Sequence, residues 1–224
     1  MPHDVLPNPL ELAAAVIDEM NKDVKEAWTE FGHGKFPAVL NPAERFYRKI
    51  DAGEFNGAPS VTWNGYDREH DRPTFIYRES SFAYITASRR RIKPQTMDTD
   101  GGSIPKALHS VGNFTPWTYA PAYIIHDWLF VAHRCGSAPD NDIDFETSAL
   151  LLAESIKTLM EVGFVTTDGK RATLPKDQDT LYLVYLAVKS PVARKLWDKK
   201  ADTSKCPEPH GALTKSTAGA GEVH

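Results

Sequence analysis

Two neighbouring ionisable side chains, His126 and Asp127, interrupt an otherwise apolar stretch over residues 119–132. A helix that is apolar on all sides is a buried helix, so both side chains would lie away from water. A buried carboxylate without a partner is costly, and Asp127 should therefore be paired, hydrogen-bonded or bound to a metal. Adjacent residues on a helix point about 100° apart, so the two must serve separate partners. One arrangement that satisfies both has His126 facing a substrate water while Asp127 holds a cation.

The loop before this helix supplies complementary groups. Within DTDGGSIP, residues 98–105, lie the carboxylates of Asp98 and Asp100, the glycines Gly101 and Gly102, and the hydroxyl of Ser103. Glycines let the backbone turn its amides or carbonyls toward a ligand at close range. Carbonyls combined with carboxylates make a hard-oxygen site suited to calcium or magnesium. We therefore expect a cation held jointly by this loop and Asp127.

Two further histidines, His109 and His133, leave an alternative open. His133 lies two helical turns beyond His126 on the same face, so a nitrogen-rich zinc site is conceivable. No Glu-x-x-His signature accompanies these histidines, and zinc ranks below calcium or magnesium. The structural alternative needs no metal: Asp100 and Ser103 cap a turn, while His126 and Asp127 bond to backbone groups in the core.

Bulk composition limits the class of protein. The chain has 224 residues, 41% of them hydrophobic and 25% charged, which is typical of one soluble globular domain. A net charge of -4 and a pI near 6.1 argue against general affinity for nucleic acid or anionic membranes. The one dense basic run, 89–91, is expected to be a solvated strand end. No apolar run is long enough to span a membrane.

The N-terminus and the cysteines bear on the compartment. The first twenty residues carry acidic side chains within their apolar part and lack a basic n-region, which is unlike a secretory signal. Cys135 and Cys206 are far apart in sequence, and the second lies in a polar stretch, so we expect neither a disulfide framework nor a metal knuckle. These features predict a reducing, cytosol-like compartment unless the chain leaves it as part of an assembly.

An amphipathic helix is predicted over residues 8–34. Asn8 and Pro9 are typical of a helix start, and Gly32 and Gly34 of its end. The helix packs on its own domain or, because a spacing of three and four also suits a coiled-coil seam, docks on a partner or on a second copy of the chain. The apolar stripe consists of Leu10, Ala13, Ile17, Met20, Val24, Ala27 and Phe31.

The rest of the chain, 35–200, is predicted to form the main domain, followed by a polar tail over 201–224. A short helix is expected near 42–52, and a long exposed loop or irregular hairpin over 56–73. Two aromatic and β-branched runs, 74–80 and 82–92, are expected to pair with each other as strands. Helices are predicted over 119–132, over 144–163 and over 177–200, the last bent or broken by Pro191. The fold class is therefore α+β: mostly helical, with a small antiparallel sheet and a central buried helix that carries His126 and Asp127.

The loop and helix motifs together resemble a known family. Thr99–Pro105 and then HDWLF, 126–130, are similar to the signature of a domain-of-unknown-function family common in tailed phages and prophages, roughly T-D-x-x-S-x-P followed by an apolar run into H-D-x-L-[YF]. Family members continue with a helix that bears an acidic residue and ends near a glycine. In LLLAESIKTLMEVG, Glu154 occupies that acidic position, where the family more often has Asp. The resemblance covers about residues 73–190.

This resemblance implies a protein encoded by a phage or prophage, located in the host cytoplasm or in the virion. Its partners would be other virion proteins, or a second copy through the N-terminal helix. A more distant likeness is to secreted phospholipases A2 of bacteria and fungi. It implies that His126 is the general base, that Asp127 holds calcium together with carbonyls of the 100–103 loop, and that Glu154 orients His126. This chain departs from those enzymes because they carry disulfides between loop and helix and a secretory signal.

Two hypotheses about function follow. The first is a phage- or prophage-encoded hydrolase that uses His126 and a bound cation against an ester or a cell-envelope bond. The second is a non-enzymatic virion structural or accessory protein, in which the TDGGS loop and the His-Asp pair form a structural latch between loop and helix. A nucleic-acid-binding module is disfavoured by the acidic balance.

Overall fold

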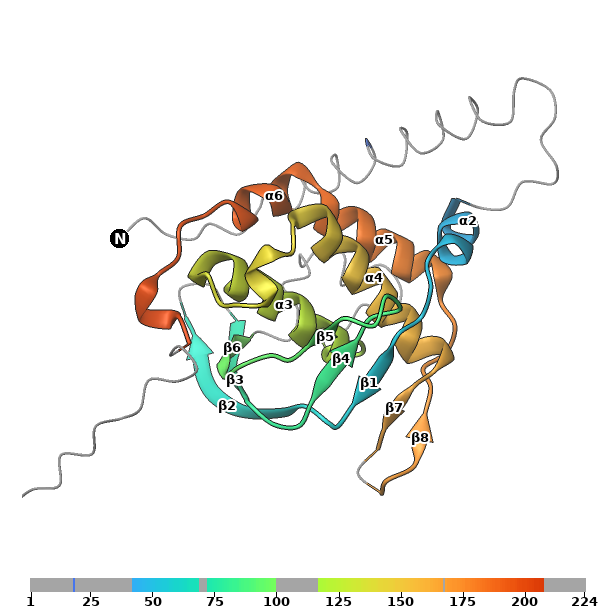
Figure 1. Cartoon of the computed structure of the whole chain (residues 1–224), viewed down its shortest axis with the longest axis horizontal. Coiled ribbons are helices and arrows are strands. Elements are labelled where there is room, and N and C mark those ends of the chain that lie inside the picture. The colour runs from blue at the N-terminus through green and yellow to red at the C-terminus, as the bar shows by residue number, and fades with distance from the viewer. Residues whose placement is uncertain (1–17, 19–41, 69–71, 100–116, 167, 208–224) are drawn as a thin grey trace, which may run out of the picture.

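The computed structural model describes residue 18 and residues 42–68, 72–99, 117–166 and 168–207 (Figure 1). Helices and small antiparallel sheets form an α+β fold, as the sequence predicts. The α-helices α3, α4, α5 and α6 lie together, and strands β1 to β6 lie beside α3 and α4 (Figure 1). The elements in chain order are α2 (Pro42–Lys49), β1 (Glu54–Asn56), β2 (Ser60–Asp67), β3 (Arg72–Arg78), β4 (Ala83–Ile85), β5 (Arg91–Ile92), β6 (Met97–Thr99), α3 (Ala120–Cys135), η2 (Asp140–Asp142), α4 (Phe145–Glu161), β7 (Phe164–Val165), β8 (Arg171–Ala172), α5 (Gln178–Lys189), α6 (Pro191–Trp197) and η3 (Thr203–Lys205).

The ends of the long helices have local causes. α4 starts where the Asp144 carboxylate accepts a hydrogen bond of 2.7 Å from the Thr147 backbone N–H. α3 ends at Gly136, which takes the left-handed conformation with a φ of 67°. The predicted break at Pro191 is confirmed, because Ser190 ends α5 and its side chain caps the start of α6. Burial of α3 is also confirmed: the buried residues on it are Ala122, Tyr123, Ile124, Ile125, His126, Trp128, Leu129 and Ala132.

The predicted pairing of runs 74–80 and 82–92 is wrong. β3, in the first run, pairs with β2 and β6, whereas β4 pairs with β1 on one side and with β5 on the other. The short link between β3 and β4 turns the chain into a second sheet rather than back along the first. A run of aromatic and β-branched residues predicts that a segment is a strand but carries no information about its partner, which explains the error.

A β-bulge lies in the antiparallel hairpin formed by β2 and β3, here called the ribbon. The sequence predicts a long loop or an irregular hairpin for part of this segment, 56–73. Trp63 stands opposite Phe75, but the next pair is Tyr66 with Pro73, so β2 contains one extra residue at this point. Gly65 takes a φ of 102° there, a backbone conformation that favours glycine. Because facing residues share one face of a sheet, the extra residue places Tyr66 on the same face as Trp63.

The aromatic face of this ribbon is exposed at its outer end. Trp63 is 60% and Tyr66 52% exposed, although Trp63 packs edge-on against Phe75 at 5.3 Å. Phe75 in turn packs edge-on against Trp117, whose exposure is 37%. Exposed aromatic side chains gathered on one face are typical of an interaction surface.

The basic run 89–91 is not simply a solvated strand end. Arg90 donates hydrogen bonds to Oδ1 of Asp142, at 2.6 Å, and to the carbonyl of Pro139, at 2.9 Å. Its guanidinium also lies 3.3 Å from Oδ1 of the buried Asp140. Arg90 therefore joins the turn between β4 and β5 to η2.

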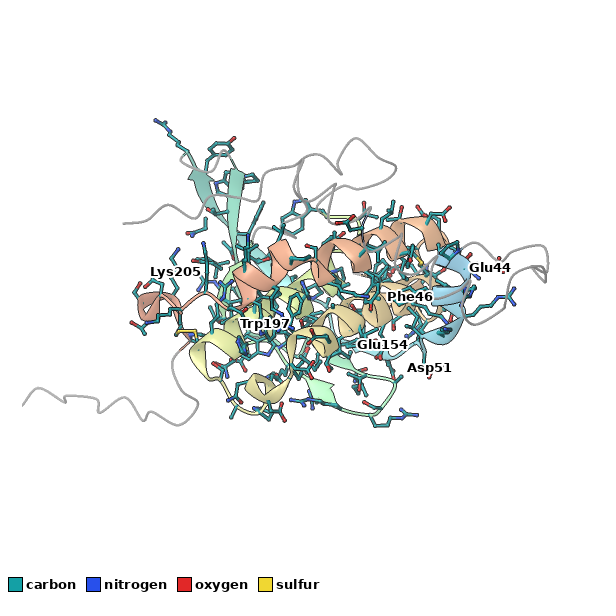
Figure 2. All side chains as sticks on the ribbon, turned by 90° about the horizontal axis from the view of Figure 1, so that it is seen from above. Glu44, Phe46, Asp51, Glu154, Trp197 and Lys205 are labelled. Carbon is teal, nitrogen blue, oxygen red and sulfur yellow. A yellow bond between two sulfur atoms is a disulfide. The ribbon has the colours of Figure 1, made fainter. Side chains whose placement is uncertain are left out.

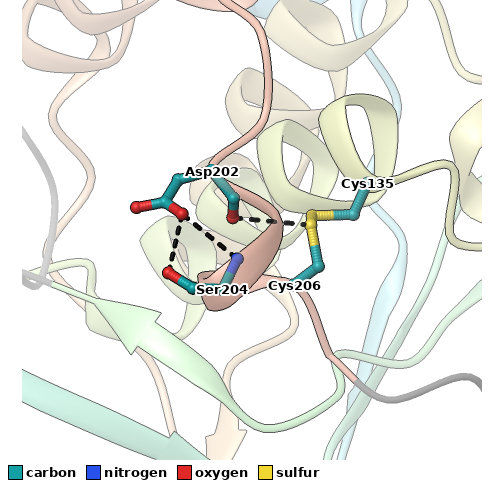
Figure 3. The surroundings of a disulfide bond; sticks show 4 residues. All are labelled: Cys135, Asp202, Ser204 and Cys206. Carbon is teal, nitrogen blue, oxygen red and sulfur yellow. Dashed lines mark hydrogen bonds between the residues drawn. A yellow bond between two sulfur atoms is a disulfide. The ribbon is translucent and has the colours of Figure 1, made fainter.

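Two expectations about the C-terminal part are corrected. Cys135 and Cys206 form a disulfide with a Cα–Cα distance of 5.6 Å, although they are separated by 71 residues in sequence. The predicted polar tail thus contains a folded portion, because η3 and Cys206 are attached to the end of α3 (Figure 3). The predicted helix over 8–34, apart from Asp18, and residues 208–224 lie outside the described residues. Within the described residues, no helix is long and apolar enough to cross a membrane.

Candidate functional site

The best-defined part of the predicted site joins the end of β6 to α3. The Thr99 hydroxyl donates a hydrogen bond of 2.7 Å to Oδ2 of Asp127. Thr99 pairs with Phe75, so it lies on the aromatic face of its sheet and points toward α3. Asp98 pairs with Ile76 and occupies the opposite face, where it is exposed. The structure therefore places Thr99, and not Asp98, beside Asp127.

His126 lies on a different side of α3, against α4. Its side chain is buried, with 8% of the residue exposed, and it packs edge-on against Phe130 at 5.0 Å. Burial lowers the pKa of His126 to about 4, although a hydrogen bond with the Ser148 backbone acts in the opposite direction. Its Nδ1 atom is buried and has no hydrogen-bond partner among the described residues. His126 and Asp127 thus serve separate partners, as the helix geometry predicts.

Glu154 is part of a separate polar network between α4 and the β4 strand. Its Oε1 accepts two hydrogen bonds of 2.8 Å, from the Tyr84 hydroxyl and from the Ala87 backbone N–H. Tyr84 also lies 3.0 Å from the hydroxyl of Thr158, which in turn accepts a hydrogen bond of 2.8 Å from the Gly53 N–H. Within the described part of the chain, no hydrogen bond joins Glu154 to His126. The structure therefore does not bring Glu154 and His126 together as base and orienting residue.

The surroundings of Glu154 are partly open. Burial raises the pKa of the Glu154 carboxyl, the two donors lower it, and the charge of Asp51 raises it further. Glu154 and Asp51 lie at the α2 end of the molecule (Figure 2). Together with Lys49, Ile50, Ala87, Ser88 and Leu150, they line a shallow pocket of about 450 Å³. His126 is not among the residues that line this pocket.

His133 has a packing role. Its ring stacks on the indole of Trp197 in α6, with ring centroids 4.2 Å apart and planes 20° from parallel. Trp197 is buried, and Phe130 and Phe145 pack against it edge-on at 4.9 and 5.8 Å. His133 therefore contributes to the contact between α3 and α6 and is not placed to join His126 in a zinc site.

Several predicted site residues cannot be placed. Asp100, Gly101, Gly102, Ser103 and His109 lie outside the described residues, and their roles stay predictions. Within the residues that the structure describes, no group of three or more His, Cys, Asp or Glu side chains could hold a metal ion. Asp127 by itself supplies one carboxylate, which also accepts the Thr99 hydrogen bond. The residues described do not make up a cation site.

No family model, curated protein or solved structure matches the chain. The site therefore has to be judged on its own geometry.

Sequence reasoning did not assign the donors that hold the two carboxylates. Thr99 belongs to the loop motif and directly precedes Asp100. This position was the one sequence feature that could have indicated that Thr99 donates a hydrogen bond to Asp127. Tyr84 and Ala87 lie about 70 residues before Glu154 in the chain, and nothing in the local sequence connects them. Only the packing of the β4 strand against α4 brings them to Glu154.

Proposed function

We propose that the protein is a non-enzymatic structural or accessory component of a tailed-phage virion, in which Thr99 and Asp127 latch the end of β6 to α3. The phage attribution rests on the family resemblance of the loop and helix motifs. The observation that carries the non-enzymatic role is the burial of His126, the candidate general base beside Asp127.

A general base must reach the proton that it removes, and it works best with a pKa near the operating pH. His126 meets neither condition in the described structure. Its Nδ1 atom is buried away from solvent, and the imidazole ring makes a hydrogen bond with the Ser148 backbone. A pKa near 4 keeps the imidazole neutral at pH 7 but makes it a weak base. A packing role for His126 and a hydrogen-bonding role for Asp127 agree with these contacts.

The exposed ribbon supports the assembly role. Val61, Trp63 and Tyr66 stand on one face of β2, at the outer edge of a three-stranded sheet. The outer edge of an edge strand presents backbone donors and acceptors that a further extended strand can use. A protein chain of the same assembly that adds such a strand would also cover the aromatic side chains.

The test combines stability and activity. We expect Thr99→Val to lower the free energy of unfolding by about 1.5–3 kcal/mol, because the hydrogen bond to a carboxylate is lost. Thr99→Ser keeps the hydroxyl and serves as the matched control. We also expect the native protein to leave short-chain esters, phospholipid vesicles and peptidoglycan intact, with or without added calcium, magnesium or zinc.

The hydrolase hypothesis predicts a different set of results. A cation that raises the melting temperature of the native protein but not of Asp127→Asn would show a metal site, since a ligand of the folded state stabilises it. Turnover that disappears in His126→Gln would identify this residue as the base. Those two results together would overturn the non-enzymatic proposal.

A further inference from the structure

Residues 200–207, here called the strap, follow α6 and end beside the last turn of α3. The chain is firmly anchored just before the strap, because Trp197 is buried against α3 and Arg134 donates a hydrogen bond to the Leu196 carbonyl. The strap itself is different: none of its residues is buried. It therefore contributes little apolar contact to hold its own position.

The hydrogen bonds of the strap are local. Asp202 accepts hydrogen bonds from the backbone N–H and the hydroxyl of Ser204, at 3.1 and 2.6 Å (Figure 3). The N–H groups of Lys205 and Cys206 donate to the carbonyls of Asp202 and Thr203. These contacts shape the single turn η3 but do not attach it to α3.

The disulfide supplies the long-range attachment. Cys135 is the last residue of α3, and its sulfur is bonded to Cys206 at the end of η3 (Figure 3). Both cysteines are half-buried and neither is enclosed in the core. Among the described residues, this covalent bond is the long-range link that the structure shows between the strap and α3, because the hydrogen bonds of the strap are local and none of its side chains is fully buried.

We propose that the strap is a redox-controlled element: it is held against α3 when the disulfide is formed and is released when the disulfide is reduced. This inference does not depend on the proposed function. The strap is held under oxidising conditions, in which disulfides persist, and is released under reducing ones.

The chemistry balances as an ordinary thiol–disulfide exchange. The two thiol S–H bonds break and one S–S bond forms between Cys135 and Cys206, with loss of two protons and two electrons. An oxidant of the disulfide class, such as oxidised glutathione, accepts the electrons and is converted to two thiols. A dithiol reductant reverses the step.

Limited proteolysis of the full chain tests the proposal. The protein is oxidised with glutathione disulfide or reduced with a phosphine, its thiol content is measured by mass spectrometry, and both forms are digested with trypsin. Lys200 and Lys205 are exposed cleavage sites within the strap. We expect cleavage at these sites to be at least about tenfold faster in the reduced form, because proteolysis follows the population of the open state. Lys170, whose side chain is 82% exposed in the β7–β8 hairpin, is the internal control and should be cut at equal rates.

Cys135→Ser provides the matched variant, since it cannot form the bond. It should be cut in the strap at the fast rate under both conditions. Equal cleavage rates in the two native forms, with the disulfide verified in one of them, would overturn the proposal. Two free thiols in the glutathione-treated protein would overturn it as well, because the bond on which it depends would not form.

Discussion

The indole Nε1 of Trp128 donates a hydrogen bond of 2.7 Å to Oδ2 of Asp140, which is only 3% exposed. Arg90 reaches the other oxygen of the same carboxylate. Burial raises the pKa of Asp140, while the hydrogen bonds from Trp128 and Arg90 lower it. The carboxylate thus connects α3 with η2 and with the turn between β4 and β5. Trp128, which follows the His-Asp pair directly, has a defined polar role in addition to its packing.

Replacing Trp128 should reveal the cost of leaving this carboxylate short of a donor. We expect Trp128→Phe to lower the free energy of unfolding by about 1–3 kcal/mol from the unsatisfied buried acceptor, with a further loss from the smaller ring. Urea unfolding at pH 7 measures the difference. Trp63→Phe is the matched control on the exposed ribbon and should change the stability by less than about 0.5 kcal/mol. Equal losses in both variants would show that the Trp128–Asp140 bond is not the cause.

The acid sensitivity of the protein should depend on His126. Its pKa is about 4 in the folded state, compared with 6.5 for an unperturbed histidine. The unfolded chain therefore binds the proton first as the pH falls, and stability is lost between about pH 6.5 and 4. The expected loss from this residue is roughly 3 kcal/mol, since one pKa unit corresponds to about 1.4 kcal/mol.

His126→Gln tests this pH dependence because glutamine does not titrate and retains a side-chain donor for the Ser148 backbone. The unfolding free energy of the variant, measured in urea at several pH values from 7 to 4, should fall less steeply than that of the native protein. Parallel curves for the two proteins would contradict a buried, neutral His126.

Glu154 offers a pair of variants with opposite expectations. Glu154→Ala removes the acceptor of the Tyr84 and Ala87 hydrogen bonds, and we expect a loss of about 1–3 kcal/mol. Glu154→Gln keeps an oxygen acceptor without a charge. The pKa of Glu154 is higher in the folded protein than in the unfolded chain. Ionisation of this carboxyl therefore lowers the free energy of unfolding as the pH rises from the pKa of the unfolded chain through the pKa of the folded protein. At pH 7 the glutamine variant should therefore match or exceed the native protein in thermal stability, and a loss as large as that of Glu154→Ala would contradict the assignment.

Lys157 should be important for the attachment of α2. Its Nζ donates hydrogen bonds to the carbonyls of Tyr47 and Ile50, at 3.0 and 2.7 Å, and lies 4.6 Å from the centre of the Tyr47 ring. We expect Lys157→Met to cost about 1–3 kcal/mol, since it leaves two carbonyls at the end of α2 without their donor. Lys176 lies over the same ring but is exposed and makes no such bonds among the described residues. Lys176→Met is the control and should cost less than about 1 kcal/mol in the same urea measurement. Similar costs would assign the effect to the aromatic contact.

Local signals in the sequence predicted the helices well. The apolar stretch before and after His126 predicted the buried helix α3, and Gly163 and Pro191 marked helix ends that the structure confirms. Strand pairing could not be predicted in the same way. β3 has two partners, and its pairing with β2 and β6 rather than with β4 depends on where the connecting turns direct the chain.

The candidate site shows the same division. The helix geometry predicted that His126 and Asp127 need separate partners, and Thr99 lay within the motif that was singled out. The sequence could not show that Ser148 would be the neighbour of His126, or that Tyr84 and Ala87 would hold Glu154. These contacts join residues that are distant in the chain, and hydrophobic packing of α4 on α3 and of the β4 strand on α4 decides them.

The sequence by itself determined the α+β class, the bounds of the main helices and the need of Asp127 for a polar partner, because periodicity, caps and the cost of a buried charge act locally. Only the tertiary structure decided that His126 is enclosed, that Glu154 belongs to another network and that Cys135 meets Cys206. The reason is physical: separation along the chain, even 71 residues, places no lower limit on distance in a folded domain. Which distant groups meet is set by the packing of the whole core.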